Sequence, residues 1–173
     1  DMASMFSSMY NISNLDLTGF NTSQVTDMTQ MFTGMKSIKN LDLSSFDTSK
    51  VTTMAIMFAG MDKIENLNLS SFDTRNVTNM SLMFYNMSNL ITLNLSNFNT
   101  EKVQNMKYMF DSCSSLTSLN LSNFNIKKVQ DMSGMFGNNT SLRTIYCNNT
   151  WTCALSDEMF YNCKSLKGEV KYN

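Results

Sequence analysis

The stretch MTQMFTGMKSIKNLDLSSF, residues 28–46, decides the fold because it recurs almost unchanged as MAIMFAGMDKIENLNLSSF at residues 54–72. Its Met-Phe pair returns at a spacing of 26 residues, with one last interval of 24. The pairs occupy residues 5–6, 31–32, 57–58, 83–84, 109–110, 135–136 and 159–160. Self-similarity at a fixed period of roughly 20 to 50 residues is the signature of stacked repeats. The sequence therefore predicts a repeat solenoid.

Two kinds of apolar spacing occur within each repeat. The leucines of LxL, such as Leu41 and Leu43, alternate with a polar residue, which is typical of a short strand with one inward face. Val25, Met28 and Phe32 are separated by three and four residues, which favours a helical or 3-10 turn with one apolar face. We therefore expect one short parallel strand per 26-residue rung, with helical or 3-10 turns on the opposite side.

The repeats account for most of the chain. Residues 1–147 hold about six of them, and the pattern starts within a unit because Asp1 occupies the place of Asp27 and Asp131. We expect the chain to be part of a longer protein. The first rung would then lack a cap here, which predicts end-to-end self-association at that rung.

An irregular segment replaces the repeat after this point. An open stack needs a different terminal unit to cover its last apolar face, so we expect residues 148–173 to be a cap with Trp151 over that face. Cys147 and Cys153 are separated by NNTWT and could close a small disulfide loop. Such a bond would suit an extracellular setting.

The methionine and phenylalanine columns favour a core over a cofactor or a methionine metal site. Each unit must present the same side chains to its neighbours, and unbranched Met adapts to small misfits. Cys113 and Cys163 share one column but lie two rungs apart, about 10 Å at the strand spacing. That separation exceeds the reach of a disulfide, so both are predicted to be thiols.

Composition excludes several classes of function. The 13 Lys and Arg residues against 14 Asp and Glu give a net charge of -1, without the positive field that holds nucleic acid. The chain has no histidine, the commonest general base and metal ligand. We expect no enzyme, no cofactor and no nucleic-acid partner. The longest mostly apolar run, residues 54–61, is far shorter than the roughly 20 residues of a membrane span, so no membrane insertion is expected.

One exposed column on the strand face is the candidate partner-binding surface. Polar residues between the two leucines point away from the core, and the open sheet of a solenoid is its usual binding surface. The column consists of Asp16, Asp42, Asn68, Asn94, Asn120 and Tyr146. It has no Trp or Arg anchor of the kind that dominates tight interfaces. A structural spacer is therefore as good an interpretation as a binding site.

A mildly basic edge follows the corner after the strand. It consists of Lys50, Arg75, Lys102, Lys127 and Lys128. These residues are ordinarily interpreted as a solvated corner. The more specific alternative is that the edge contacts anionic glycans or a negatively charged surface, in which case binding would be sensitive to salt.

An Asx-Thr pair precedes this edge in most units. The Asx residues are Asn21, Asp47, Asp73, Asn99 and Asn125. They could bind calcium, but a hydrogen bond from each side chain to the turning backbone is favoured. The threonines that follow these Asx residues form a column of their own. It would suit an ice-binding lattice only if it continued, but Ile126 stands where the next threonine would be.

The recurring MFxxMxxIxxLDLSxFxT, and MFDSCSSLTSLNLSNFN at residues 109–125 above all, resembles the BspA-like leucine-rich repeats of the mycoplasma-type lipoprotein subgroup. The resemblance implies a right-handed leucine-rich-repeat solenoid on secreted or surface-anchored bacterial proteins, many of which act in adhesion. Most units here have Met where that family often has Cys. We therefore expect a non-catalytic bacterial surface module that recognises a protein or glycan on a host or neighbouring cell, with a spacer or assembly unit as the alternative.

Overall fold

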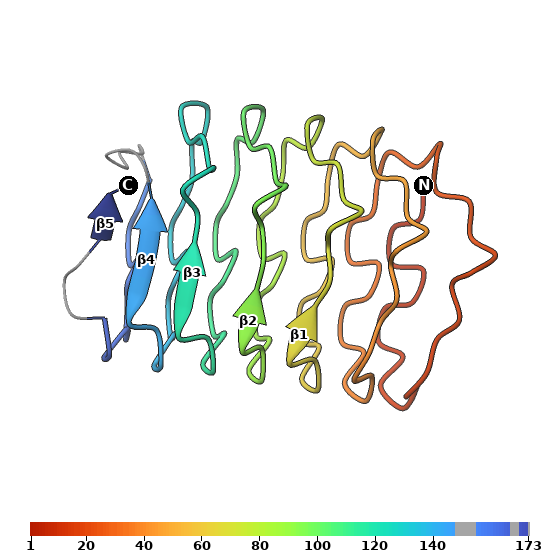
Figure 1. Cartoon of the computed structure of the whole chain (residues 1–173), viewed down its shortest axis with the longest axis horizontal. Coiled ribbons are helices and arrows are strands. Elements are labelled where there is room, and N and C mark those ends of the chain that lie inside the picture. Colours follow the sequence, from red (N-terminus) through yellow and green to blue (C-terminus); the bar gives the residue numbers. More distant parts are fainter. Residues whose placement is uncertain (148–154, 167–169, 173) are drawn as a thin grey trace.

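The chain is a row of repeated units with little regular secondary structure. The computed structural model describes residues 1–147, 155–166 and 170–172. Successive units lie side by side in sequence order along the long axis, with the two termini at opposite ends (Figure 1). Most of the backbone is coil and turn, joined by short parallel strand pairs. This arrangement is that of a repeat structure, as the 26-residue period predicts.

The strands are short, and all of them pair in parallel. They are β1 (Asn66–Leu67), β2 (Thr92–Leu93), β3 (Ser118–Asn120), β4 (Thr144–Cys147) and β5 (Val170–Tyr172). β1 pairs with β2, and β3, β4 and β5 form a three-stranded sheet in that order. Equivalent residues of neighbouring units face each other, as in the Leu119↔Ile145 pair.

The prediction of one strand in every rung is wrong for the first two units. Residues 14–17 and 40–43 are not strands, and the described main chain makes no ladder of hydrogen bonds between them. The LxL alternation is nevertheless present there, and Leu17 and Leu43 are buried. Apolar alternation thus fixes which side chains point inward, while a strand additionally requires paired backbone groups on the neighbouring unit.

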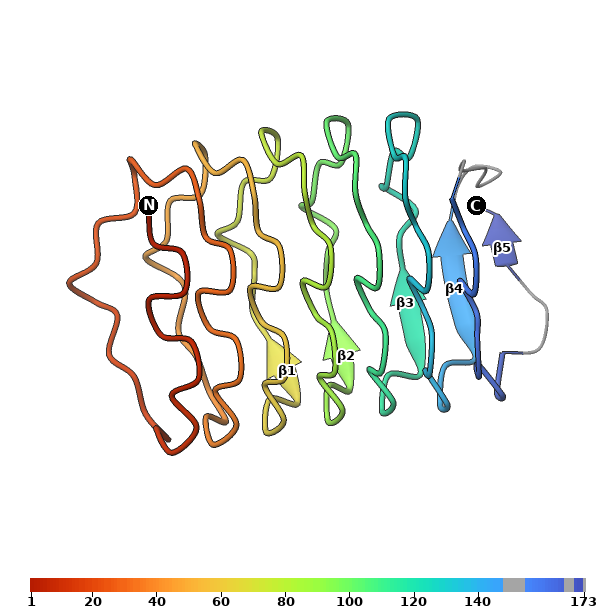
Figure 2. The ribbon, with the colours of Figure 1, turned by 180° about the vertical axis from the view of Figure 1, so that it is seen from behind.

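Figure 2 shows the molecule from behind, with the side opposite the strands in view. Main-chain hydrogen bonds between units hold this side. The amide of Phe32 donates to the carbonyl of Met57 at 2.9 Å, and the amide of Phe58 donates to the carbonyl of Met83 at 3.0 Å. Isolated parallel bridges continue along the stack from Asp27↔Thr53 to Asp131↔Leu155. We call the part of each unit equivalent to residues 28–35 the turn side.

The turn side is not helical, so the prediction of helical or 3-10 turns is wrong for the described residues. Its hydrogen bonds within a unit join residues three apart, such as the amide of Met31 to the carbonyl of Met28 at 3.2 Å. Gln30 and Gly34 have φ values of 58° and 72°. A left-handed residue at the third position of a turn gives a type II turn and stops a helix from propagating. The unit therefore bends through successive turns.

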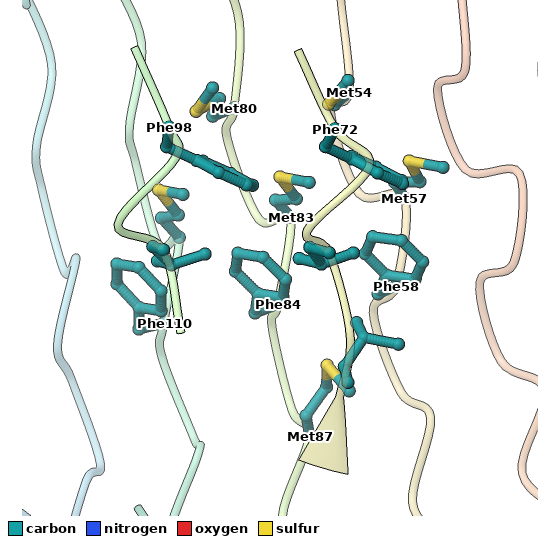
Figure 3. Close-up of a cluster of buried hydrophobic side chains, with 14 of the residues drawn as sticks. Met54, Met57, Phe58, Phe72, Met80, Met83, Phe84, Met87, Phe98 and Phe110 are labelled. Carbon is teal, nitrogen blue, oxygen red and sulfur yellow. The ribbon is translucent and has the colours of Figure 1, made fainter. Parts of the chain in front are cut away.

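Phenylalanine rings form a continuous ladder through the core. Phe58, Phe84 and Phe110 stack in a row with methionines around them (Figure 3). Along the whole ladder, ring centroids lie 5.5 to 5.9 Å apart with interplanar angles of 9° or less. Its members are Phe6, Phe32, Phe58, Phe84, Phe110, Phe136 and Phe160. The prediction that the Met and Phe columns are core is confirmed by their burial in the units between the two ends of the stack.

A buried threonine column connects neighbouring units. The hydroxyl of Thr48 donates to the carbonyl of Asp73 at 3.0 Å and accepts its amide at 2.8 Å. The same pair of bonds joins Thr22 to the main chain of Asp47, Thr74 to that of Asn99 and Thr100 to that of Asn125. All four side chains are buried, so this column is a structural clamp and offers no surface to ice.

A second polar column lies where Cys and Asn take the place of Met late in the chain. Cys113 donates its thiol to the carbonyl of Phe84, one unit earlier, at 3.1 Å. In the next unit Asn139 donates to the carbonyl of Phe110 at 2.8 Å, and Cys163 donates to that of Phe136 at 2.8 Å. Each polar side chain thus satisfies a main-chain acceptor of its neighbour.

Candidate functional site

The predicted partner-binding column is exposed and is held by turns at the end of the LxL segment. The Oδ1 atom of Asp42 accepts the amide of Ser44 at 2.9 Å, and that of Asn94 accepts the amide of Ser96 at 3.1 Å. The same bond, from the amide two residues later in the chain to Oδ1, is made by Asp16, Asn68 and Asn120. Such Asx turns fix the side chain against the backbone. The Oδ1 of each side chain is therefore committed to the fold, which leaves Oδ2 of the aspartates and the amide nitrogen of the asparagines for other contacts.

The two aspartates of this column stay charged. The pKa of Asp16 is lowered by its hydrogen bonds from the main chain and side chain of Thr18. The pKa of Asp42 is lowered by hydrogen bonds from the side chain and main chain of Ser44. The rest of the column is neutral, since Asn68, Asn94 and Asn120 are amides. The face thus carries its negative charge toward the N-terminal end.

Tyr146 continues the column in β4. Its partner in the register of β3 and β4 is Asn120, and its side chain is half-buried. The structure thus places Tyr146 beside Asn120, and shared hollows join Asp16 with Asp42 and Asn68 with Asn94. Tyr146 is the bulkiest of them, and the remaining five present only small polar groups.

Shallow hollows lie along the strand side of the described residues, and sequence reasoning missed one of them. That hollow has a volume of about 440 Å³ and is lined by Lys39, Asn40, Lys63, Glu65, Asn66 and Asn89. A second, of about 290 Å³, includes Asp16 and Asp42, and a third, of about 150 Å³, includes Asn68 and Asn94. The 26-residue period could have found the first, because it places Lys39 beside Glu65 and Lys63 beside Asn89.

The predicted basic edge also contains acidic residues and neutral partners. The guanidinium of Arg75 lies 2.8 Å from the carboxylate of Asp73 on its own corner. Lys50 and Lys102 are exposed but donate to amides of the preceding unit, Gln24 and Asn76, both at 2.7 Å. The period of 26 also stacks Lys50 with Lys102 and Lys128 but places Arg75 and Lys127 in the neighbouring column.

Acidic residues occupy the same edge. Asp47 is exposed beside Lys50, and Glu101 shares a hollow of about 360 Å³ with Lys127. The positive charge expected from Lys and Arg alone is therefore largely offset, and Lys127 and Lys128 are the part of the edge where two lysines adjoin.

The Asx residues of this corner close turns, as the structural interpretation predicts. The Oδ1 of Asp47 accepts the amide of Ser49 at 3.0 Å, and that of Asn99 accepts the amide of Glu101 at 3.0 Å. Asn21, Asp73 and Asn125 make the equivalent bond. Within the described ranges, no three His, Cys, Asp or Glu residues gather where they could hold a metal ion.

The cysteines divide into two groups. Cys113 and Cys163 are free thiols, as predicted, and burial raises the pKa of Cys113 to about 12. Cys147 is buried. Its predicted partner Cys153, and the predicted covering residue Trp151, lie outside the described residues. The part of the chain that the structure describes also contains no helix long and apolar enough to cross a bilayer.

Comparison with known proteins identifies a family. The model of the family described as "Mycoplasma protein of unknown function, DUF285" matches residues 1–93 and again residues 62–172. The two matches together span nearly the whole chain, and the chain belongs to this family. No curated protein and no solved structure gives a significant match.

Proposed function

With membership of the DUF285 family as the premise, we propose that the chain is a non-catalytic recognition module of a bacterial cell surface. In this proposal the units form a right-handed solenoid of the BspA-like leucine-rich-repeat kind. The strand side binds a glycan or protein on a host or neighbouring cell. The family's mycoplasma description supports the bacterial source, and the exposed Asx column supports the choice of surface.

The observation that carries the proposal is the rigid, regular presentation of this column. Each exposed Asx side chain is tied to the backbone by a hydrogen bond of 2.9 to 3.1 Å. A side chain that is already ordered loses little further conformational entropy when a partner binds. The neighbouring hollow mixes Lys39, Lys63 and Glu65 with three amides. Such donors and acceptors suit the hydroxyl groups of a glycan.

A spacer within a longer surface protein is the second candidate. It is favoured by the uniformity of the same column, in which five of the six residues are Asp or Asn. A tight protein interface commonly has buried Trp, Tyr or Arg anchors, and here Tyr146 alone is of that kind. A spacer needs only the stack, and it tolerates any change on the exposed face.

The experiment that separates the two candidates is binding to an array of glycans and extracellular proteins. Hits are then measured by titration with the parent chain and with Asp16→Asn/Asp42→Asn. These exchanges keep an oxygen that can close the Asx turn and remove only the charge. Asp47→Asn is the matched control, because Asp47 closes the same kind of turn on another corner.

Saturable binding that weakens at least tenfold in the double variant, and stays unchanged in the control, supports recognition by the strand side. A second variant, Lys63→Ala/Glu65→Ala, tests the large hollow without touching an Asx turn. Absence of saturable binding on the array, or binding indifferent to both double variants, argues for the spacer.

A further inference from the structure

We propose that the hollow lined by Lys39, Lys63 and Glu65 binds an anionic sugar, a ring with one carboxylate or sulfate group and several hydroxyl groups. Its volume of about 440 Å³ lies within the range of about 300 to 1,000 Å³ that is usual for small-molecule sites. The inference rests on the proposed function, because it names the class of ligand that the strand side takes. It does not involve the exposed Asx column.

The hollow lies where the row of paired strands begins. β1 pairs with β2 on one side, but residues 40–43 on its other side are not a strand. In the next unit the amide of Ile91 donates to the carbonyl of Glu65 at 2.8 Å. The amide of Glu65 and the carbonyl of Lys39, which occupy the equivalent places one unit earlier, have no partner among the described residues. Main-chain polar groups are therefore left open beside the hollow.

The charged side chains of the hollow are also available to a ligand. Lys39 and Lys63 come from two neighbouring units, and Glu65 is the acidic residue of the lining. All three are exposed, and the ion pairs found among the described residues join other groups. The lining thus carries one net positive charge, which favours a ligand with a single anionic group.

Two asparagines of the lining are already oriented by hydrogen bonds. The Oδ1 of Asn66 accepts the hydroxyl of Thr92, which leaves the amide nitrogen of Asn66 as a donor. The Nδ2 of Asn89 donates to the carbonyl of Asp62, which leaves the Oδ1 of Asn89 as an acceptor. A sugar hydroxyl both donates and accepts, so it can bond to either group. Side chains that are ordered beforehand lose little further entropy on binding.

The composition of the lining separates a sugar from other small ligands. All six residues that line the hollow are charged or carry an amide. A nucleotide base commonly stacks on aromatic side chains, and an apolar ligand needs apolar walls; this lining offers neither. An anionic sugar matches it, because the ammonium groups bind the anion while Glu65 and the asparagines bind the hydroxyl groups.

The test compares three methyl glycosides that share one ring, namely the glucuronide, the glucoside 6-sulfate and the neutral glucoside. Each is titrated at physiological salt into the isotope-labelled chain, and the NMR shifts of the main-chain amides give the dissociation constant and the place of binding. Lys39→Gln/Lys63→Gln removes the positive charge of the hollow and keeps polar side chains. Lys50→Gln/Lys128→Gln is the matched control, because it removes the same charge from exposed lysines outside the hollow.

At least one anionic glycoside should bind about tenfold more tightly than the neutral one and shift the amide of Glu65. The tighter of the two identifies the anionic group. The hollow variant should lose about tenfold of that affinity, and the control variant should keep it.

Equal binding of charged and neutral glycosides overturns this inference, as does an anionic glycoside that binds the hollow variant and the parent chain alike. Absence of binding by all three glycosides overturns it as well. The proposed function is judged separately, because saturable hits on the array that depend on Asp16 and Asp42 would keep recognition by the strand side while this inference fails.

Discussion

The hydroxyl of Thr74 lies between the two main-chain polar groups of Asn99, donating to its carbonyl at 2.9 Å and accepting its amide at 2.8 Å. Thr74 is buried, and three other threonines repeat the contact in neighbouring units. One side chain therefore replaces the pair of bonds that a strand would have supplied between these corners. This explains how units with so few strand residues remain joined.

Thr74→Val should lower the free energy of unfolding by about 1 to 3 kcal/mol, because it removes a donor and an acceptor from buried main-chain groups while keeping the volume. Thr52→Val is the control: its hydroxyl also bonds a carbonyl, that of Thr26, but the bond is exposed. A change within about 0.5 kcal/mol is expected there. Urea unfolding measures both, and equal losses would contradict the clamp.

Asn139→Leu should destabilise the chain by about 1 to 3 kcal/mol, since the carbonyl of Phe110 loses its side-chain donor inside the core. Asn139→Cys should cost less. Cys113 and Cys163 make the equivalent bond in the units on either side, and Cys also removes the Oδ1 of Asn139, which has no partner within the described residues. Thermal unfolding of the two variants ranks them, and a Cys variant no better than Leu would argue against the column.

Gly60→Ala should cost on the order of 1 kcal/mol through backbone conformation alone. Gly60 has a φ of 68°, and an added Cβ would meet nothing closer than 3.8 Å, so crowding makes no contribution and the left-handed backbone does. Gly19→Ala is the matched control, because a Cβ there meets nothing within 4 Å and no positive φ is required. It should be neutral or slightly stabilising. A neutral Gly60→Ala would contradict the turn conformation.

Stability should fall on acidification below about pH 4. The Asx turns lower the pKa of Asp16, Asp42 and Asp47 in the folded chain. The pKa of an aspartate in the unfolded chain is about 3.9. A carboxylate with a depressed folded pKa contributes stability above the unfolded pKa and loses it as the pH falls through the folded value. Unfolding midpoints between pH 7 and pH 3 measure this. The triple Asp→Asn variant should lose less stability over that range, and an equal loss would assign the effect to other groups.

The repeat and its core could be inferred from the sequence because stacking imposes the same side chain at the same place in every unit. The columns that contain Phe32 and Leu43 can therefore be recognised in the sequence by their period of 26, and these two residues are buried as expected. The threonine column could be recognised in the same way, but its structural role could not. Only the structure shows that its hydroxyls face the main chain of the next unit rather than solvent.

The candidate surface was only partly predictable for a related reason. The pattern placed Asp16 and Asp42 outward correctly, yet it could not reveal that Arg75 pairs with Asp73. That contact joins two columns of one corner, and a period reports only what lies in one column. The bonds of Lys50 to Gln24 and of Lys102 to Asn76, in contrast, join residues 26 apart, which the period does place side by side. The hollow at Lys63 and Glu65 lies between adjoining units, where the period places Lys39 beside Glu65 and Lys63 beside Asn89.

The sequence by itself determined the repeat, its register and its core, since each depends on side chains that every unit must share. The tertiary structure alone decided the path of the turn side. Its left-handed positions hold Gln30, Ile56 and Tyr108 as well as glycine, so no residue type marks them. Bonds from the neighbouring unit, such as the amide of Gln30 to the carbonyl of Ala55 at 2.9 Å, hold a backbone conformation that an isolated unit would not keep.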